Sequence, residues 1–118
     1  MTVKINNITI PSTIANRGKY NYQPPAILGV NGAGAAVVSP YAAITWQFAY
    51  MTITDYTWWR TTLLGGAASL TCTANTTLVN DLQAEINCTC IVMRPTYERI
   101  QNGLYLNVEI KIERVVTV

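Results

Sequence analysis

The feature that most constrains the fold is a strict alternation of apolar and polar residues near the end of the chain. From residue 104 to 113 the even positions are Leu, Leu, Val, Ile and Ile, and the odd positions are Tyr, Asn, Glu, Lys and Glu. Because successive side chains of a β-strand point to opposite faces, this pattern predicts a strand that turns residues 104, 106, 108, 110 and 112 toward a core. Asn102-Gly103 predicts a tight turn at its start. Its length and regularity also make the strand a candidate free edge for pairing with another subunit.

Similar patterns predict further strands in the rest of the chain. Residues 44–51 alternate with Ile44, Trp46 and Phe48 on one face. Residues 79–93 alternate with Ile86, Cys88, Cys90 and Val92 on one face. Shorter strands are predicted within 3–10, as a hairpin around Asn6-Asn7, and at 68–73, which a turn at 75–77 would end.

One segment shows helical spacing instead. Thr52 is a potential N-cap with Asp55 three residues later, and Gly65-Gly66 is a typical helix end. We therefore expect an α-helix at about 53–64. With 118 residues, the chain suits one domain, 1–118. The expected fold class is mainly β: an antiparallel β-sandwich or barrel with one flanking α-helix.

Residues 20–40 break the strand pattern and carry no charge. The stretch contains Pro24, Pro25 and the glycine-rich segment 29–34, and residues 35–38 are predicted to return as a strand. Long irregular segments of this kind are usually functional or disordered. We expect an extended arm or loop at about 20–40 that leaves the body of the domain and contacts a neighbouring subunit.

Composition also favours association. Half of the residues are apolar and only 12% are charged, against about 25% in an average soluble domain. The apolar excess predicts surface that other subunits cover. The eight basic residues are scattered, so no specific nucleic-acid binding is expected. The long uncharged stretch contains too many Pro and Gly residues for a spanning helix, and the N-terminus does not read as a secretory signal, so we expect synthesis in the cytoplasm and no membrane association.

The residue types offer little for catalysis. The chain has no histidine, which removes the commonest general base and metal ligand. Its three cysteines, Cys72, Cys88 and Cys90, are expected to be buried and reduced. Glu109 and Glu113 share a strand face with Lys111, as on a solvated edge. We therefore expect no enzyme, no catalytic or metal-binding residue and no cofactor.

The order of these segments resembles the small tail proteins of bacteriophages. The segments that carry the resemblance are 4–11, 29–32, 44–48, 54–65 and 102–114. The resemblance implies a tail-tube type of fold, a β-barrel or sandwich with one helix. It also implies subunits that join into rings and an arm that reaches the next ring. It further implies a location in the virion after synthesis in the host cytoplasm, with copies of the chain and other virion proteins as partners. The chain departs from the pattern in its few acidic residues, because the lumen of such tubes is often acidic.

Two alternatives stay open at the level of sequence. One is a capsid cement (decoration) protein that binds and stabilises the shell. The other is a small soluble ligand-binding β-domain, an alternative that the tryptophan and tyrosine residues support. The residues expected at subunit contacts lie in the arm, on the helix and on the outer face of the last strand: Tyr20, Tyr22, Pro24, Pro25, Ile27, Leu28, Val30, Val37, Trp58, Tyr105, Asn107 and Glu109.

Overall fold

The computed structural model describes residues 3–15 and 17–118. In these residues the chain is mainly β. The first half contains β1 (Lys4–Ile5), β2 (Ile8–Thr9), α1 (Ser12–Ala15), β3 (Lys19–Gln23), β4 (Ile27–Val30), β5 (Ala36–Val38) and β6 (Ala42–Thr52). The second half contains α2 (Ile53–Thr57), the π-helix η1 (Trp58–Leu63), β7 (Ser69–Val79), β8 (Glu85–Met93), β9 (Arg99–Gln101) and β10 (Leu104–Thr117).

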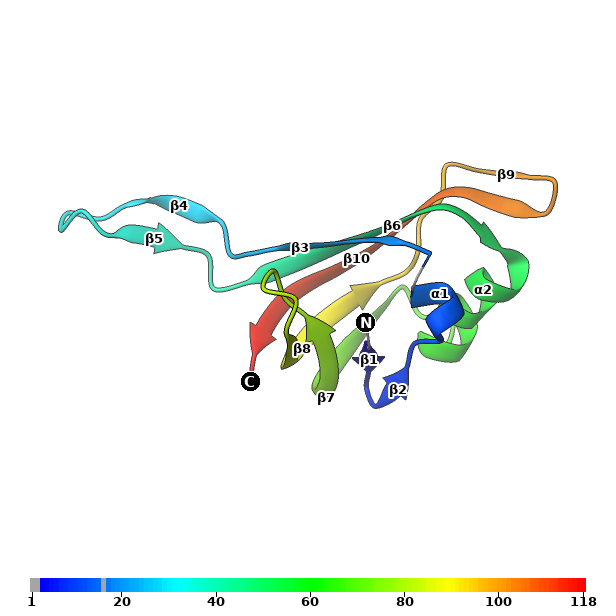
Figure 1. The fold of residues 1–118 in the computed structure, drawn as a ribbon, viewed down its shortest axis with the longest axis horizontal. Helices are drawn as coiled ribbons and strands as arrows, with labels where there is room; N and C mark the ends of the chain where they lie inside the picture. The colour runs from blue at the N-terminus through cyan, green and yellow to red at the C-terminus, as the bar shows by residue number, and fades with distance from the viewer. Residues whose placement is uncertain (1–2, 16) are drawn as a thin grey trace.

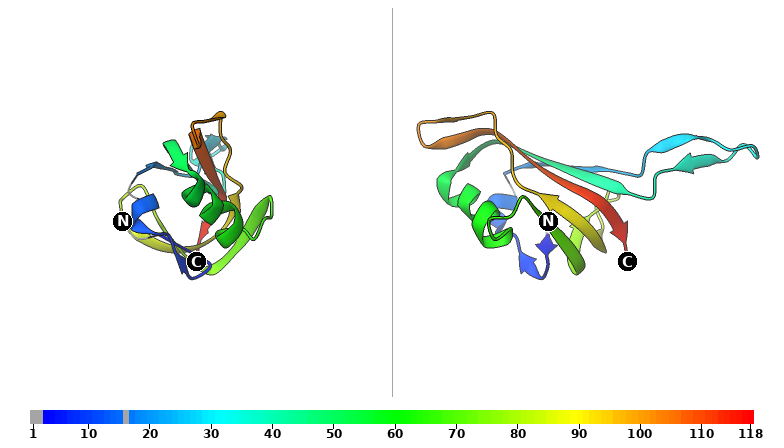
Figure 2. Two further views of the ribbon diagram at one scale, coloured as in Figure 1. Left: turned by 90° about the vertical axis from the view of Figure 1, so that its right-hand side faces the viewer. Right: turned by 180° about the vertical axis from the view of Figure 1, so that it is seen from behind.

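Eight strands form one antiparallel sheet with the order β2-β1-β7-β8-β10-β6-β3, and β9 pairs with the start of β10. Figure 1 shows the sheet with α1, α2 and η1 gathered at one end and the β4–β5 hairpin projecting from the other. The view along the long axis in Figure 2 shows that the sheet curls round its own core. The predicted barrel-like β fold with a flanking helix is confirmed.

The curl brings β3, one edge of the sheet, close to the end of β7. The Tyr20 hydroxyl donates to the Val79 carbonyl (2.8 Å) and accepts from the Val79 N–H (3.1 Å). These two bonds join the strands through one side chain in place of a backbone ladder. Burial raises the pKa of Tyr20 above the usual range, which keeps the hydroxyl protonated and able to donate. We call this junction the Tyr20 seam.

The core inside the curl is built on aromatic residues. Trp46 and Trp59 are both fully buried, and their rings meet edge to face with centroids 5.8 Å apart. The Phe48 ring stacks on Trp46 with centroids 5.7 Å apart, and the Tyr20 ring meets Trp46 edge-on with centroids 5.1 Å apart. Gly18 lies against the same indole, so close that a Cβ there would be 2.3 Å from Trp46 Nε1. The strand β6 and the helical segment thus hold one aromatic cluster between them.

Local sequence signals explain the turns that shape the sheet. Asn6 and Asn7 both have positive φ, 48° and 69°, so the predicted β1–β2 hairpin is confirmed. Asn102 and Gly103 also have positive φ and form the predicted tight turn between β9 and β10. Thr52 caps α2 by accepting from the Asp55 N–H at 3.2 Å, as its position predicts.

The prediction for the last strand is right for its second half and wrong for its first. Val108, Ile110 and Ile112 are buried as expected, but Leu104 and Leu106 are only half-buried, while Tyr105 packs on the core. Asn107 has a φ of 53°, an unusual value for a strand residue, and the face that meets the core changes across it. The strand is also no edge, because β6 lies along one side and β8 and β9 along the other.

Two further predictions need correction. The turn expected at 75–77 is a bulge within the continuous strand β7, between Cys72 and Thr76. The Asn6 side chain accepts from the Thr73 N–H at 2.8 Å and so satisfies the disrupted backbone. The helix covers 53–63, close to the predicted 53–64, but only the first five residues are α-helical. Its second part is a π-helix, in which Trp59 and Leu63 are buried while Trp58 and Arg60 are not.

Candidate assembly surface

The β4–β5 hairpin stands apart from the domain, and we call residues 24–40 the arm. Every residue from 24 to 38 is exposed, including both strands of the hairpin. The long dimension of the molecule, 57 Å against 28 and 25 Å for the other two, reflects this projection. The arm begins after β3. The expected segment 20–40 is therefore corrected at its start, because residues 20–23 pair with β6 in the main sheet.

The tip of the arm is organised by Asn31. Its side-chain oxygen accepts from the N–H groups of Ala33 (2.9 Å) and Ala35 (3.0 Å), and its N–H donates to the Ala35 carbonyl at 2.8 Å. At the root, the Ser39 N–H donates to the Ala26 carbonyl at 2.8 Å. The backbone bonds of the hairpin are thus made within the arm, and its side chains are left to solvent.

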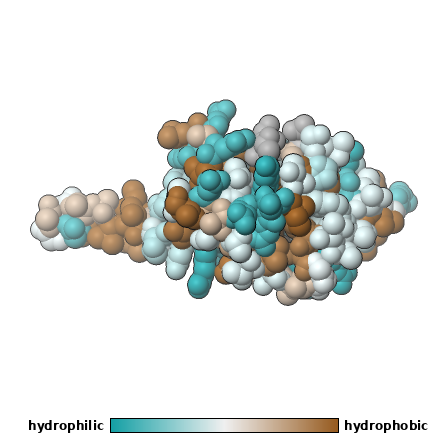
Figure 3. Space-filling view, turned by 90° about the horizontal axis from the view of Figure 1, so that it is seen from below, coloured by the Kyte–Doolittle hydropathy of each residue, from teal (hydrophilic) through white to brown (hydrophobic). Residues whose placement is uncertain are grey.

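Those side chains are apolar. Ile27, Leu28 and Val30 are 71%, 68% and 70% exposed, and Val37 and Val38 are also exposed. Opposite residues of an antiparallel pair share a face, so the pairs Ile27–Val38 and Val30–Ala36 lie on one side and Val37 on the other. Figure 3 shows the brown of hydrophobic residues along the arm, at the left of the view. Both faces of the projecting hairpin therefore carry exposed apolar side chains.

A second apolar surface lies at the opposite end of the molecule, near β9 (Figures 1 and 2). Tyr105 stacks on Tyr56 with centroids 4.1 Å apart, and Tyr97 meets both rings edge-on at 5.0 and 5.6 Å. Ile100 is the register partner of Tyr105 and is 55% exposed, and Tyr97 is 43% exposed. We call Tyr97, Ile100 and Tyr105, with Tyr56 beneath them, the tyrosine patch. Burial raises the pKa of Tyr56.

The residues predicted at subunit contacts are spread over five places: the arm, β3, the π-helix η1, the tyrosine patch and a groove on the sheet. The arm holds Pro24, Pro25, Ile27, Leu28, Val30 and Val37. Tyr20 and Tyr22 are half-buried in β3, and Tyr20 serves the seam. Trp58 is half-buried against Trp59, with centroids 5.3 Å apart. Sequence reasoning found Tyr105 of the patch but missed Tyr97 and Ile100, which lie in a stretch whose pattern predicts no strand.

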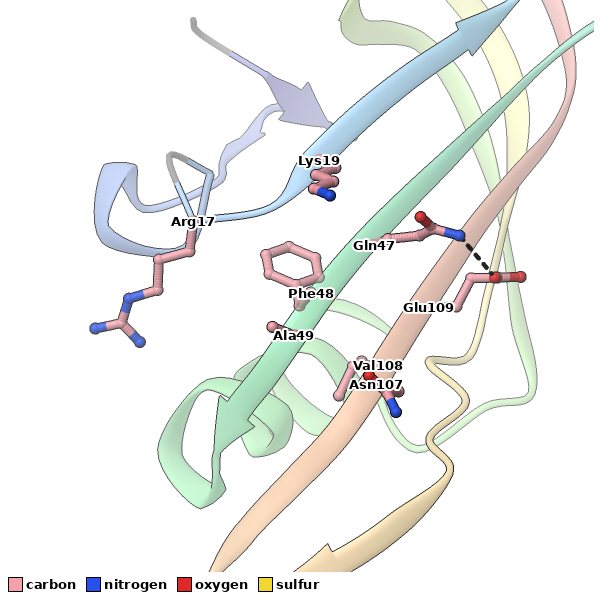
Figure 4. Close-up of a pocket in the computed structure, with 8 residues that line it drawn as sticks. All are labelled: Arg17, Lys19, Gln47, Phe48, Ala49, Asn107, Val108 and Glu109. Atoms are coloured by element: carbon pink, nitrogen blue, oxygen red, sulfur yellow. Dashed lines mark hydrogen bonds between the residues drawn. The ribbon is translucent and has the colours of Figure 1, made fainter.

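Asn107 and Glu109, the last two predicted contact residues, line a groove of about 450 Å³ on the outer face of the sheet (Figure 4). Lys19 and Gln47 lie beside them, and the Gln47 amide donates to Glu109 at 3.5 Å. The Lys111 ammonium lies 3.6 Å from the other oxygen of the same carboxylate. The Asn107 side chain bonds to Glu98. Gln47 and Glu109 are thus bonded to each other, while Asn107 and Glu109 are also engaged by Glu98 and Lys111 at the margin of the groove.

Within residues 3–15 and 17–118, no three His, Cys, Asp or Glu side chains cluster in a way that could hold a metal ion. No helix in the same residues is long and apolar enough to cross a membrane. Comparison with known protein families, with curated proteins and with solved structures finds no match for this chain.

Proposed function

We propose that this protein is a non-enzymatic structural subunit that assembles with copies of itself into a ring or tube of a bacteriophage tail. The observation that carries the proposal is the arm, a hairpin that keeps five large apolar side chains in water on both of its faces. Copies of the chain and other virion proteins would be its partners, and the virion its location. The resemblance of the sequence to small tail proteins supports the choice of a tail.

The energetics of the arm support association. A lone two-stranded hairpin is at best marginally stable in water, and this one has no packing against the domain to hold it. Burying one large aliphatic side chain is worth roughly 1.5–3 kcal/mol. Association that covers Ile27, Leu28 and Val30 would therefore contribute several such increments and order the hairpin at the same time.

The positions of the two apolar surfaces support the form of the assembly. The arm and the tyrosine patch lie at opposite ends of the long axis, so an arm cannot reach the patch of its own chain (Figure 1). A contact between the arm of one copy and a different surface of the next is heterologous. Heterologous contacts generate closed rings or open filaments, depending on the rotation between subunits.

Sedimentation velocity and negative-stain electron microscopy of the purified chain test the proposal. The parent is expected to form rings or tubes as its concentration rises. The double variant Leu28→Ser, Val30→Ser should remain a folded monomer. Leu82→Ser is the matched control, because Leu82 is also apolar and is 82% exposed, but lies in the β7–β8 turn. A parent that stays monomeric at all concentrations, or an arm variant that assembles like the parent, would refute the proposal.

Mass spectrometry of purified particles tests the location in the virion. A tail subunit should be present in many copies and should remain with isolated tails. Recovery with tail-free capsids would favour the cement alternative instead. Absence from particles, combined with a monomer in solution, would favour the ligand-binding alternative.

A further inference from the structure

Two of the three cysteines face each other across adjacent strands. Cys72 of β7 and Cys90 of β8 are direct register partners in the antiparallel pair. Both are free thiols and both are buried, at 3% exposure each. Because opposite residues of a strand pair share a face, the two side chains point into the core side by side.

This arrangement has the spacing of a disulfide. Opposite residues in an antiparallel pair have Cα atoms about 4.5–5.5 Å apart. Disulfides join Cα atoms that are about 4.4–6.8 Å apart, so the backbone spacing of such a strand pair lies within the range that a disulfide needs.

The third cysteine provides an internal comparison. Cys88 is also buried, free and on the same face of β8, but its register partner is Thr76. Its thiol points to the Thr76 carbonyl, at 3.9 Å. Cys88 and Cys90 are two residues apart on one strand, with nearly parallel side chains, about 6.6 Å from Cα to Cα. The cross-strand pair is therefore the better placed for a bond.

The ionisation of the pair assigns the two roles. A hydrogen bond from the Cys90 thiol lowers the pKa of Cys72, and the same contact raises the pKa of Cys90. Within the pair, Cys72 is thus the sulfur that more readily becomes a thiolate, the reactive form. The Cys90 thiol lowers the pKa of Cys88 in the same way, so the strand register is what distinguishes Cys72 as the partner of Cys90. Cys90 keeps its proton and lies ready as the second, resolving thiol.

The position of Cys72 in the sheet gives a route for a small oxidant. On its outer side β7 pairs with β1 at Thr77, beyond the bulge that separates Cys72 from Thr76. Strand segments at an edge and next to a bulge open locally at lower cost than the centre of a sheet. A brief opening of this kind would admit a molecule the size of hydrogen peroxide.

We propose that Cys72 and Cys90 form an oxidation site that hydrogen peroxide converts to an intramolecular disulfide. The Cys72 thiolate attacks one peroxide oxygen, the O–O bond breaks, and a sulfenic acid and hydroxide form. The Cys90 sulfur then attacks the Cys72 sulfur, the S–O bond breaks, and the hydroxyl leaves as water with the Cys90 proton. Two thiols give up two electrons, and one peroxide becomes two waters. The bond would tie β7 to β8 and does not depend on the proposed assembly.

Thiol counting and peptide mapping test the site. The purified, fully reduced chain is treated with hydrogen peroxide, quenched, denatured and alkylated, and intact mass then gives the number of remaining thiols. The parent is expected to fall from three thiols to one, and mapping should link the peptides that contain Cys72 and Cys90. Cys88→Ala should fall from two thiols to none. Cys72→Ala should keep both of its remaining thiols. Cys90→Ala should form no disulfide, and Cys72 should instead be found as a sulfenic acid, one oxygen atom heavier than the thiol.

Several results would overturn the inference. One is that all three thiols remain after a peroxide exposure that oxidises a denatured sample. The others are a mapped link between Cys88 and Cys90 and a link between two chains. The mapping on the parent needs no variant, so a substitution that disturbs folding does not affect the decision. Near-UV circular dichroism of each variant shows which thiol counts come from folded protein.

Discussion

Gly18 tests the packing of the aromatic core most directly. An alanine there would place its Cβ 2.3 Å from Nε1 and 2.5 Å from Cδ1 of Trp46, and 2.8 Å from Cε2 of Phe48. Trp46 is fully buried and is held by the rings of Tyr20, Phe48 and Trp59, so it cannot move aside freely. Overpacking of a rigid core costs about 1–3 kcal/mol, and contacts this short place Gly18→Ala toward the upper end.

Urea unfolding, followed by tryptophan fluorescence at a concentration where the chain is monomeric, measures this cost. With a slope of about 1–3 kcal/mol per molar urea, a loss of this size lowers the midpoint by roughly 1 M. Gly29→Ala is the matched control, because a Cβ at Gly29 meets no atom within 4 Å. It should change stability by less than about 0.5 kcal/mol. A Gly18→Ala variant as stable as the parent would show that the described contact between the Gly18 backbone and the indole is wrong.

Two further predictions concern the seam and the helix. Tyr20→Phe removes both bonds to the buried Val79 backbone, so the free energy of unfolding should fall by about 1–3 kcal/mol, measured in urea. Because the pKa of Tyr20 is raised in the folded state, the folded chain keeps a proton that the unfolded chain loses above about pH 10. The contribution of Tyr20 to stability is therefore fully present below that pH and is lost above it, so the fall in stability above about pH 10 should be shallower in Tyr20→Phe; equal slopes would contradict this. Thr52→Ala removes the N-cap bond to Asp55 and should cost about 1 kcal/mol in the same assay, whereas Thr52→Ser should cost less.

Sequence patterns predicted the elements whose causes are local. The alternation at 108–112, the cap at Thr52 and the turn at Asn6-Asn7 each depend on a few neighbouring residues, and the structure confirms them. The projecting arm was also predictable, because proline, glycine and a lack of charge mark it in the chain. Its root was misplaced by four residues, since the strand β3 forms only where β6 provides a partner.

The features that sequence reasoning missed depend on distant partners. The bulge in β7 is satisfied by Asn6, which lies 67 residues away from Thr73 in the chain. The sequence alternates without interruption through Asn107, so it gives no sign that the strand face turned to the core changes there. In the structure this change turns Tyr105 instead of Leu104 and Leu106 toward the core. The same change assembles the tyrosine patch. Tyr97 joins it from a segment with no strand pattern of its own, so only the fold brings these rings together.

The way the arm is attached has a mechanical consequence. The arm continues directly from β3 and returns directly into β6, and both strands run along the long axis of the molecule (Figure 1). β3 and β6 are paired with each other over five consecutive residues, from Lys19 opposite Gln47 to Gln23 opposite Ala43. A tensile load on the arm along this axis pulls β3 and β6 together. β6 transfers this load to β10 as shear along their long antiparallel ladder, in which many hydrogen bonds resist at the same time. A sideways load instead peels β3 from its outer edge, where the hydroxyl of Tyr20 is the fastening to β7. The domain should therefore be stiff under axial tension and compliant under lateral bending.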